Sequence, residues 1–319
     1  MPVVALPIGR KGPLGVVALR RALSGERIDV VNSHSSTDTW LAAIACRTFW
    51  LGKRRPPALV RTRHISARVP TDAATRWLYT RATAEIVTTG EAIRQQLIRA
   101  NGVSPARVTS VPTGIDLDRF AAGDKESARN AVDLPIGVPL IGIVATLRSW
   151  KGHRYLVEAM TLLRHRDAQL VIVGDGPQAA AIRVQVAGLG LSERVRLVGN
   201  QQDVVPWLQA LDLFALPSYA NEGVPQGLVQ AMAVGVPCVT TDVGAIGEIA
   251  INDATALVVA KQNAVALAAG IDRLLDDATL ASRLVWSGRD RVHAKFGLRG
   301  MLDGMEAVFR RAADANRYR

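Results

Sequence analysis

Residues 213–240 read LFALPSYANEGVPQGLVQAMAVGVPCVT, and this stretch carries the pattern that decides the fold. Four apolar residues at 213–216 predict a buried strand, and a loop containing glycine and proline follows them. A helix is predicted over 227–234 and a second apolar strand over 237–240. Strands that are apolar throughout and alternate with helices are typical of parallel sheets covered on both faces.

The same alternation continues on both sides of this segment. Further strands are predicted over 28–32, 59–62, 85–88, 108–111, 140–145, 169–174 and 195–198. Helices are predicted over 39–50, 71–83, 91–101, 153–163, 178–189 and 204–210, with a closing helix over 298–319. The chain is therefore expected to be α/β, with one doubly wound domain following another.

A chain of 319 residues is long for one core, and a polar segment over 121–137 marks the expected boundary. The predicted domains are 1–125 and 126–297, followed by the closing helix over 298–319. The first domain shows about four strands and opens on loop-like sequence, whereas the second shows at least five. The first domain is therefore expected to be short of its opening strands.

The charge of the chain is unevenly distributed. Residues 1–120 contain 18 Lys and Arg against 8 Asp and Glu, and they hold nearly all of the net charge of +11. Such asymmetry indicates an anionic partner, either nucleic acid, an acidic membrane surface or a phosphate-bearing substrate. The alternative is a solvated basic surface without a partner.

Cysteine usage and hydropathy limit the class of protein. Neither Cys46 nor Cys238 has the neighbours of a metal-ligand pair, so the sequence predicts no disulfide scaffold and no metal. No apolar run approaches the roughly 18 residues of a membrane span. These features predict a cytoplasmic protein.

The loop after strand 213–216 is the first candidate binding site, because ligands of open α/β sheets bind outside the carboxyl ends of the strands. The following helix offers unpaired N–H groups and a positive dipole end to a diphosphate. Glu222 could accept hydrogen bonds from sugar hydroxyls, and Gln230 could reach a ribose or a base edge. The alternative is that Asn221 or Glu222 only caps the helix.

Two further loops are expected at the same edge. Arg148 and Lys151 follow strand 140–145, where two cations could neutralise a nucleotide diphosphate. Gly174 and Asp175 follow strand 169–174, although a glycine turn after a strand is a weak signal alone. Exposed loop cations are often only solvated, which is the competing interpretation.

The histidines are divided by position. His34 follows strand 28–32 at the carboxyl edge of the first domain, where it could face a substrate, and His64 occupies a comparable position after strand 59–62. A structural role is the alternative for both. His153, His165 and His293 are expected at the surface.

Taken together, these motifs resemble the GT-B glycosyltransferases of family 4, which use nucleotide sugars. The segments that carry the resemblance are SHSSTDTW (33–40), RTRHIS (61–66), VPTGID (111–116), LRSWKG (147–152), VGDGP (173–177) and the long motif over 215–244. The resemblance implies two Rossmann-like domains that face each other across a cleft, with the final helix crossing back to the first domain. It also implies retaining transfer without a cofactor or metal.

The resemblance also implies residue roles in the second domain. Glu222 matches the first acid of an E-x7-E motif and is expected to hold the hydroxyls of the donor sugar, while Gln230 stands at the second acid, expected at the ribose. Arg148 and Lys151 match the basic pair at the diphosphate. Residues 223–225 match the loop whose backbone amides approach the phosphate.

The remaining roles follow the same resemblance. Gly223, Val224 and Pro225 are thus expected in the donor site together with Gly174 and Asp175. His34 resembles the first-domain histidine that lies near the reacting carbon of the sugar.

The sequence thus predicts a glycosyltransferase that moves a sugar from a nucleotide-sugar donor to a hydroxyl of a saccharide or lipid-linked acceptor. Synthesis of cell-envelope polysaccharide, lipopolysaccharide or glycolipid is the expected setting, with the basic first domain docking on the anionic inner face of the membrane. One alternative is an inactive homologue that only binds the nucleotide sugar. The other is a basic nucleic-acid-binding module, which the 5% aromatic content disfavours.

Overall fold

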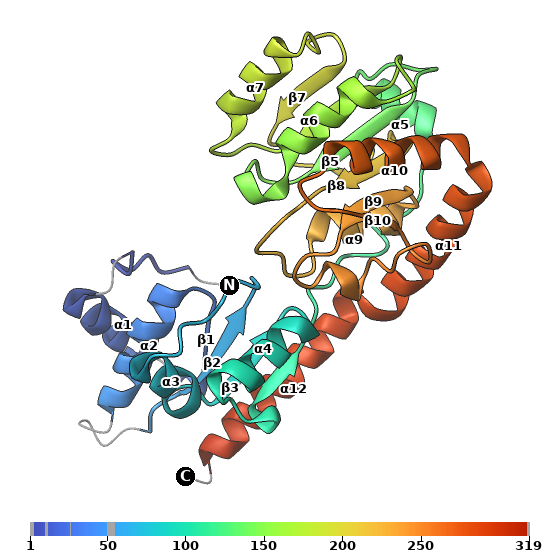
Figure 1. Cartoon of the computed structure of the whole chain (residues 1–319). Coiled ribbons are helices and arrows are strands. Elements are labelled where there is room, and N and C mark those ends of the chain that lie inside the picture. The colour runs from blue at the N-terminus through green and yellow to red at the C-terminus, as the bar shows by residue number, and fades with distance from the viewer. Residues whose placement is uncertain (1–2, 10–11, 26, 50–54, 318–319) are drawn as a thin grey trace. The chain divides into compact units, whose positions relative to one another are not determined.

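The computed structural model describes residues 3–9, 12–25, 27–49 and 55–317, and the chain divides into two compact units (Figure 1). Unit 1 consists of residues 1–112 and 301–319, and unit 2 of residues 113–300. The chain passes into unit 2 before residue 125, the boundary predicted from the sequence, because the polar segment folds there. Asp124 caps helix α5 (Lys125–Ala131), and Arg129 donates to the carboxylate of Asp212 at 2.5 Å.

Unit 1 has, within the described residues, a parallel sheet of four strands in the order β1-β2-β3-β4. The strands are β1 (Val30–Ser33), β2 (Ala58–Arg63), β3 (Glu85–Thr88) and β4 (Val108–Ser110). The helices are α1 (Pro13–Gly25), α2 (Ser36–Arg47), α3 (Ala73–Trp77), which continues as a π-helical turn (Leu78–Ala82), α4 (Glu91–Asn101) and α12 (Leu298–Arg317).

Helix α1 corrects the prediction of loop-like sequence at the start of the chain. Pro13 occupies the first helical position, where its missing N–H costs nothing. Leu19 and Leu23 then face the core beside α2 and β1. Leu14 and Val17 remain exposed, so apolar residues of α1 lie on its exposed side as well as on its buried side. The spacing of apolar residues in the sequence therefore does not indicate a helix here.

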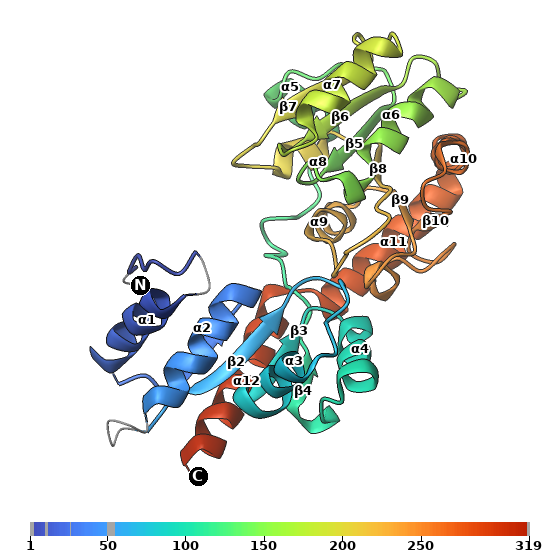
Figure 2. The ribbon, with the colours of Figure 1, turned by 60° about the vertical axis from the view of Figure 1, so that its left-hand side comes forward.

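The two faces of the unit 1 sheet bury alternate residues of the same strands. Leu59 and Ile86 pack against α2 and α4, whereas Val60 and Val87 pack against Val308 of α12. Figure 2 shows α12 running beside this sheet. Because both faces are covered, the middle positions of β2 and β3 are apolar on either side of the sheet, while polar residues such as Thr62 and Thr88 stand at the carboxyl ends of these strands.

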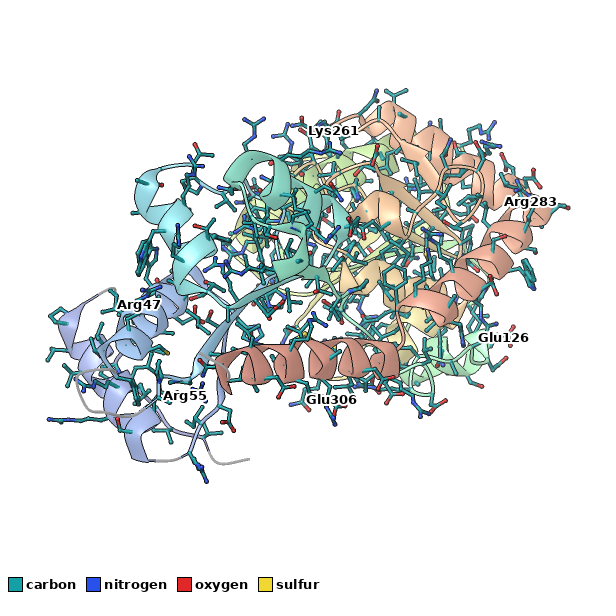
Figure 3. All side chains as sticks on the ribbon, turned by 90° about the horizontal axis from the view of Figure 1, so that it is seen from below. Arg47, Arg55, Glu126, Lys261, Arg283 and Glu306 are labelled. Carbon is teal, nitrogen blue, oxygen red and sulfur yellow. The ribbon has the colours of Figure 1, made fainter. Side chains whose placement is uncertain are left out.

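Helix α12 separates apolar and charged residues cleanly. Val308 and Ala312 are buried against the sheet. Glu306 and Arg310 lie one turn apart and form an exposed ion pair, with Glu306 on the outer side of the helix (Figure 3). The last helix of the chain is therefore part of the core of unit 1.

Unit 2 is built on six described parallel strands in the order β10-β9-β8-β5-β6-β7. The strands are β5 (Leu140–Val144), β6 (Gln169–Val173), β7 (Val195–Gly199), β8 (Leu213–Leu216), β9 (Cys238–Thr241) and β10 (Leu257–Val259). The remaining helices are α6 (His153–Leu162), α7 (Ala179–Gly188), α8 (Val205–Gln209), α9 (Gln226–Val234), α10 (Ala264–Asp276) and α11 (Ala278–Lys295). The α/β fold predicted from the sequence is confirmed.

The strand order of unit 2 has a consequence for ligand binding. Strands β5 and β8 are neighbours in the sheet but lie far apart in sequence, so the direction of winding reverses between them. In doubly wound sheets the crevice at this switch point, outside the carboxyl ends of the strands, is where ligands bind. The loops over 145–152 and 217–225 both start at this point.

Two glycines allow these loops to pack closely. A Cβ on Gly152, whose φ is +76°, would lie 2.0 Å from the carbonyl oxygen of Pro217. A Cβ on Gly227, in the first turn of α9, would lie 2.3 Å from the carbonyl oxygen of Val144. Only hydrogen fits at either position, so the loop after β5 is seated directly on the end of β8.

Gly152→Ala is expected to reduce the free energy of unfolding by about 3 to 5 kcal/mol, because it adds both a steric clash and an unfavourable φ. Gly137→Ala is the matched control, since Gly137 has a φ of +82° and open space around its Cβ position. That control is expected to cost about 1 to 2 kcal/mol, the penalty of the left-handed conformation alone. Denaturant unfolding measures both, and equal losses would contradict the close approach.

Candidate functional site

The loop after β5 and the loop after β8 are joined by a backbone hydrogen bond. The loop after β5 closes with a short 3-10 turn (Ser149–Lys151), and the amide of Tyr219 donates to the carbonyl oxygen of Trp150 at 2.8 Å. Asn221 in the second loop adopts a φ of +58°, in the left-handed region that asparagine tolerates better than most residues. The two loops therefore form one continuous surface at the switch point.

Lys151 and Glu222 form a largely buried ion pair on this surface. The ammonium Nζ of Lys151 lies 2.7 Å from Oε1 and 2.9 Å from Oε2 of Glu222. The Glu222 side chain is only 5% exposed and that of Lys151 18%. The structure thus brings together two residues, predicted from separate motifs, that stand 71 positions apart.

Ser218 is a second hydrogen-bond partner of this carboxylate. Its hydroxyl donates to Oε1 of Glu222 at 2.6 Å, and its carbonyl oxygen accepts from the hydroxyl of Thr241. Ser218 is fully buried. A buried carboxylate needs such partners to offset its lost hydration. Ser218 was not among the residues predicted from the sequence, although its place directly after the strand was a usable signal.

Helix α9 begins where the loop after β8 ends. Gly223, Val224 and Pro225 are buried and lead into its first turn, and no side chain caps that turn. An uncapped helix N-terminus leaves backbone N–H groups for a ligand and carries a positive partial charge. Because Glu222 accepts from Lys151 and Ser218, the alternative in which Glu222 caps α9 is not the arrangement observed. Gln230 lies half-buried on the second turn.

Arg148 lies on the exposed side of the same loop. Its guanidinium carbon lies 5.7 Å from the ring centroid of Trp150, and the described residues provide it with no carboxylate partner. No carboxylate of the described residues therefore compensates the charge of Arg148, whereas Glu222 pairs with Lys151.

The loop after β6 borders a separate small cavity. A Cβ on Gly174 would lie 2.1 Å from the carbonyl oxygen of Ala145, and the amide of Leu147 donates to the carbonyl oxygen of Asp175 at 3.0 Å. A cavity of about 150 Å³ lies at the ends of β5, β6 and β7. Its polar lining residues are Thr146, Asp175, Asn200 and Gln201. Asn200 and Gln201 were missed, although polar residues directly after strand 195–198 were a signal.

His34 and His64 form a stacked, hydrogen-bonded pair in unit 1. Their ring centroids lie 5.2 Å apart, and Nδ1 of His34 lies 2.9 Å from Nε2 of His64. Nε2 of His34 lies 3.1 Å from the side-chain amide of Asn32. Partial burial and the neighbouring His34 lower the pKa of His64. Both ring nitrogens of His34 therefore have a partner, whereas Nδ1 of His64 has no hydrogen-bond partner among the described residues.

His153 corrects the prediction of a surface residue. It is the first residue of α6, directly after the turn at Gly152, and only 2% of it is exposed. Neither ring nitrogen has a hydrogen-bond partner among the described residues. Burial, with a smaller contribution from the charge of Lys151, lowers the pKa of His153 to about 4. The turn at Gly152, which holds the loop after β5 against β8, thus also places this imidazole in the interior.

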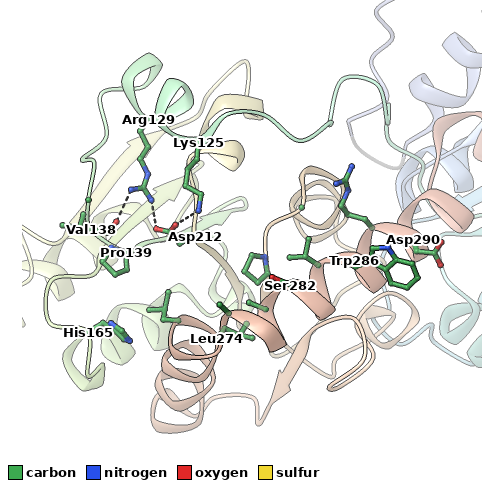
Figure 4. Close-up of a pocket in the computed structure, with 18 of the residues that line it drawn as sticks. Lys125, Arg129, Val138, Pro139, His165, Asp212, Leu274, Ser282, Trp286 and Asp290 are labelled. Carbon is green, nitrogen blue, oxygen red and sulfur yellow. Dashed lines mark hydrogen bonds and ion pairs between the residues drawn. The ribbon is translucent and has the colours of Figure 1, made fainter.

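A second, larger cavity of about 1170 Å³ lies at the opposite, amino-terminal edge of the unit 2 sheet (Figure 4). Asp212 at its wall accepts hydrogen bonds from Lys125 and Arg129 and from the amide of Leu140. Lys125 and Arg129 are thus engaged with a structural carboxylate. The chemistry predicted from the sequence is concentrated at the other edge.

Two family models match the chain. The model described as Glycosyltransferase Family 4 matches residues 1–119, and the model described as Glycosyl transferases group 1 matches residues 138–277. The chain belongs to the family 4 glycosyltransferases, and its two parallel sheets are those of the GT-B fold.

Curated relatives agree with this placement. The chain is 31% identical over 233 residues to a 2-deoxystreptamine glucosyltransferase of Streptomyces kanamyceticus, covering 71% of this chain and 60% of the relative. It is 30% identical over 309 residues to a D-inositol 3-phosphate glycosyltransferase of Mycobacterium tuberculosis, covering 89% and 62%. The chain therefore spans less than two thirds of the length of these relatives.

Solved structures share the fold at lower identity. A glycosyltransferase from Rickettsia africae superposes with a TM-score of 0.83 at 21% identity, covering 98% of this chain and 84% of that one. Anabaena Alr3699/HepE, solved in complex with UDP and glucose, gives 0.81 at 17% identity, covering 96% and 85%.

The buried neutral imidazole of His153 predicts a specific loss of stability in acid. The unfolded chain protonates this group near pH 6.5 and the folded chain only near 4, so stability present above pH 6.5 is lost as the pH falls toward 4. Between pH 7 and 4.5 the natural protein is expected to lose about 2 kcal/mol more than His153→Phe. Denaturant unfolding at both pH values measures this, with His293→Gln as an exposed control that retains the loss. Equal pH dependence in the natural protein and His153→Phe would contradict it.

Proposed function

We propose that this chain transfers a sugar from a nucleotide-sugar donor to an acceptor hydroxyl, with the donor bound at the switch point of unit 2. The observation that carries the proposal is the buried Lys151–Glu222 pair beside the uncapped N-terminus of α9. This arrangement places a cation, a fixed carboxylate and free backbone N–H groups together. A nucleotide sugar offers the matching groups, namely a diphosphate and sugar hydroxyls.

The residues then have distinct roles in the reaction. Lys151, Arg148 and the amides at the start of α9 stabilise the negative charge that develops on the departing diphosphate. Glu222 accepts hydrogen bonds from hydroxyls of the donor sugar, held in place by Ser218. These cations supply the neutralisation that a metal would otherwise provide. The resemblance to family 4 supports transfer with retention of configuration.

The nucleoside occupies the loops beyond the diphosphate. The cavity lined by Asp175 and Asn200 offers acceptors and donors for a base edge, and Gln230 on α9 contacts the ribose. The complex of the Anabaena protein with UDP and glucose supports a nucleotide sugar as the donor class. The names of the curated relatives, which act on 2-deoxystreptamine and D-inositol 3-phosphate, support a hydroxyl of a cyclic polyol as acceptor, and a saccharide or a lipid-linked glycan is the alternative.

Loss of either member of the ion pair is expected to abolish transfer. Lys151→Ala and Glu222→Gln should each lower the transfer rate by at least about 100-fold, because each removes an interaction with the transition state or the sugar. Lys261→Ala, at an exposed cation of unit 2, is the matched control. A chromatographic assay of transfer with UDP-, GDP- and ADP-sugars measures the rates, and full activity in Lys151→Ala would refute the assignment.

Calorimetry with the same donors separates transfer from binding. If the natural protein binds a nucleotide sugar and Lys151→Ala does not, while neither yields product with any acceptor tested, the chain is a nucleotide-sugar-binding homologue. This is the second candidate function, and its donor site is the same.

The basic unit 1 is further proposed to dock on an anionic membrane surface, where the acceptor is lipid-linked. Helix α1 contains no acidic residue, and Leu14, Val17 and Arg21 lie exposed along one stripe of it. Apolar side chains flanked by arginines suit the boundary between headgroups and acyl chains. Lys53 and Arg54, which contribute to the positive charge of residues 1–120, lie outside the described residues. No described helix is both long and apolar enough to cross a membrane.

Sedimentation with vesicles rich in phosphatidylglycerol tests this docking. The natural protein is expected to bind at low salt and to be released at about 0.5 M salt, because the attraction is screened within a few Å there. The variant Leu14→Gln with Val17→Gln should bind several-fold more weakly. Val265→Gln, at an exposed valine of α10, is the control and should bind normally. Absence of binding at low salt would refute the proposal.

A further inference from the structure

Four side chains at the carboxyl ends of β1 and β2 form a linear hydrogen-bond chain in unit 1. The hydroxyl of Thr62 lies 2.9 Å from Oδ1 of Asn32, and Nδ2 of Asn32 lies 3.1 Å from Nε2 of His34. Nδ1 of His34 lies 2.9 Å from Nε2 of His64. Each imidazole nitrogen can donate or accept, so the residue at the end of the hydrogen-bond chain, Thr62, determines which group donates at each step.

The buried hydroxyl of Thr62 sets that direction. Thr62 is only 5% exposed, and a buried hydroxyl needs an acceptor for its proton. Among the described residues its hydrogen-bond partner is Oδ1 of Asn32. Asn32 therefore turns its carbonyl oxygen toward Thr62 and its NH₂ group toward His34. A flipped amide would leave the Thr62 proton without an acceptor.

The orientation of Asn32 then determines both imidazole tautomers. Nε2 of His34 faces an N–H donor and must present its lone pair, so the proton of neutral His34 is on Nδ1. That Nδ1–H donates to Nε2 of His64, which must also accept. The proton of His64 is consequently on its own Nδ1, the nitrogen that is not engaged in the chain.

The charged groups next to the pair in sequence bind other partners. The carboxylate of Asp38 is taken up by the backbone amides of His34 and Ser35 and contacts neither ring. The guanidinium of Arg61 donates to Thr39 and lies over Tyr79, and that of Arg63 donates to a backbone carbonyl. Partial burial and the neighbouring His34 lower the pKa of His64, which favours its neutral form.

We propose that Thr62 and Asn32 are positioning residues that hold His34 and His64 in the same neutral Nδ1–H tautomer. This hydrogen-bond chain leaves the N–H at Nδ1 of His64 as a fixed donor for an uncharged oxygen of a ligand, such as a sugar hydroxyl. The identity of that ligand rests on the proposed function, whereas the tautomers do not. His34 in this arrangement orients His64 and has no free ring nitrogen.

Long-range ¹H–¹⁵N spectra of protein labelled with ¹⁵N at histidine test the tautomers directly. The chain has five histidines, so single substitutions assign every signal. At pH 7.5, Nδ1 of both His34 and His64 is expected at the shift of a protonated nitrogen and Nε2 at that of an unprotonated one. Protonated Nε2 on either residue in the natural protein would overturn the proposal.

Substitutions of Asn32 and Thr62 should reverse the direction of the hydrogen bonds or leave it undetermined. Asn32→Asp replaces the donor with a carboxylate, which can only accept, so Nε2 of His34 becomes protonated. Thr62→Val frees Asn32 to rotate and should give mixed tautomers, while Thr62→Ser should restore the natural state. His293, exposed on α11, is the internal control in each spectrum. Unchanged tautomers in both Asn32→Asp and Thr62→Val would also overturn the proposal.

Activity measurements connect the tautomer with catalysis. Thr62→Val is expected to lower kcat at least tenfold with little change in KM for the donor, and Thr62→Ser to recover it. A natural protein that shows the expected tautomers but transfers no sugar would refute the proposed function and leave the hydrogen-bond chain standing. Altered tautomers with unchanged kcat would refute the positioning role.

Discussion

The close contact between the turn at Gly152 and the carbonyl oxygen of Pro217 is the constraint on which the candidate site depends. It fixes the loop after β5 against the end of β8, so Lys151 of the first loop reaches Glu222 of the second. An ion pair this deeply buried loses most of its hydration, and its electrostatic attraction does little more than compensate. Its value lies in geometry, because a charged pair held in place before binding loses little conformational entropy when a ligand arrives.

Much of the fold could be predicted because buried parallel strands appear in the sequence as short runs of apolar residues. The predicted strand over 85–88 and helix over 91–101 coincide with β3 and α4, since apolar spacing decides both. Helices α1 and α5 were missed for opposite reasons. In α1, exposed apolar residues obscure the helical period, whereas in α5 only Ala128 and Arg129 are buried, so the segment reads as a polar linker.

The candidate site could be predicted as a set of loops but not as a set of contacts. The convergence of strand ends follows from the topology, which places the segments around Lys151, Asp175 and Glu222 at one edge of the sheet. No local pattern states that Lys151 pairs with Glu222, or that Ser218 supports it. The burial of His153 and the stacking of His34 on His64 likewise arise from tertiary packing across residues distant in sequence.

The placement of α12 matters for how the chain acquires its structure during synthesis. The face of the unit 1 sheet that contains Val60 and Val87 is covered by α12, whose Val308 and Ala312 follow unit 2 in the sequence. Unit 2, by contrast, is continuous in sequence and has all of its strands before residue 260. As the polypeptide emerges from the ribosome, unit 2 can therefore finish folding while unit 1, although made first, still exposes an apolar face. The N-terminal unit is the last to mature, which makes that interval the one in which the nascent chain most needs protection from aggregation.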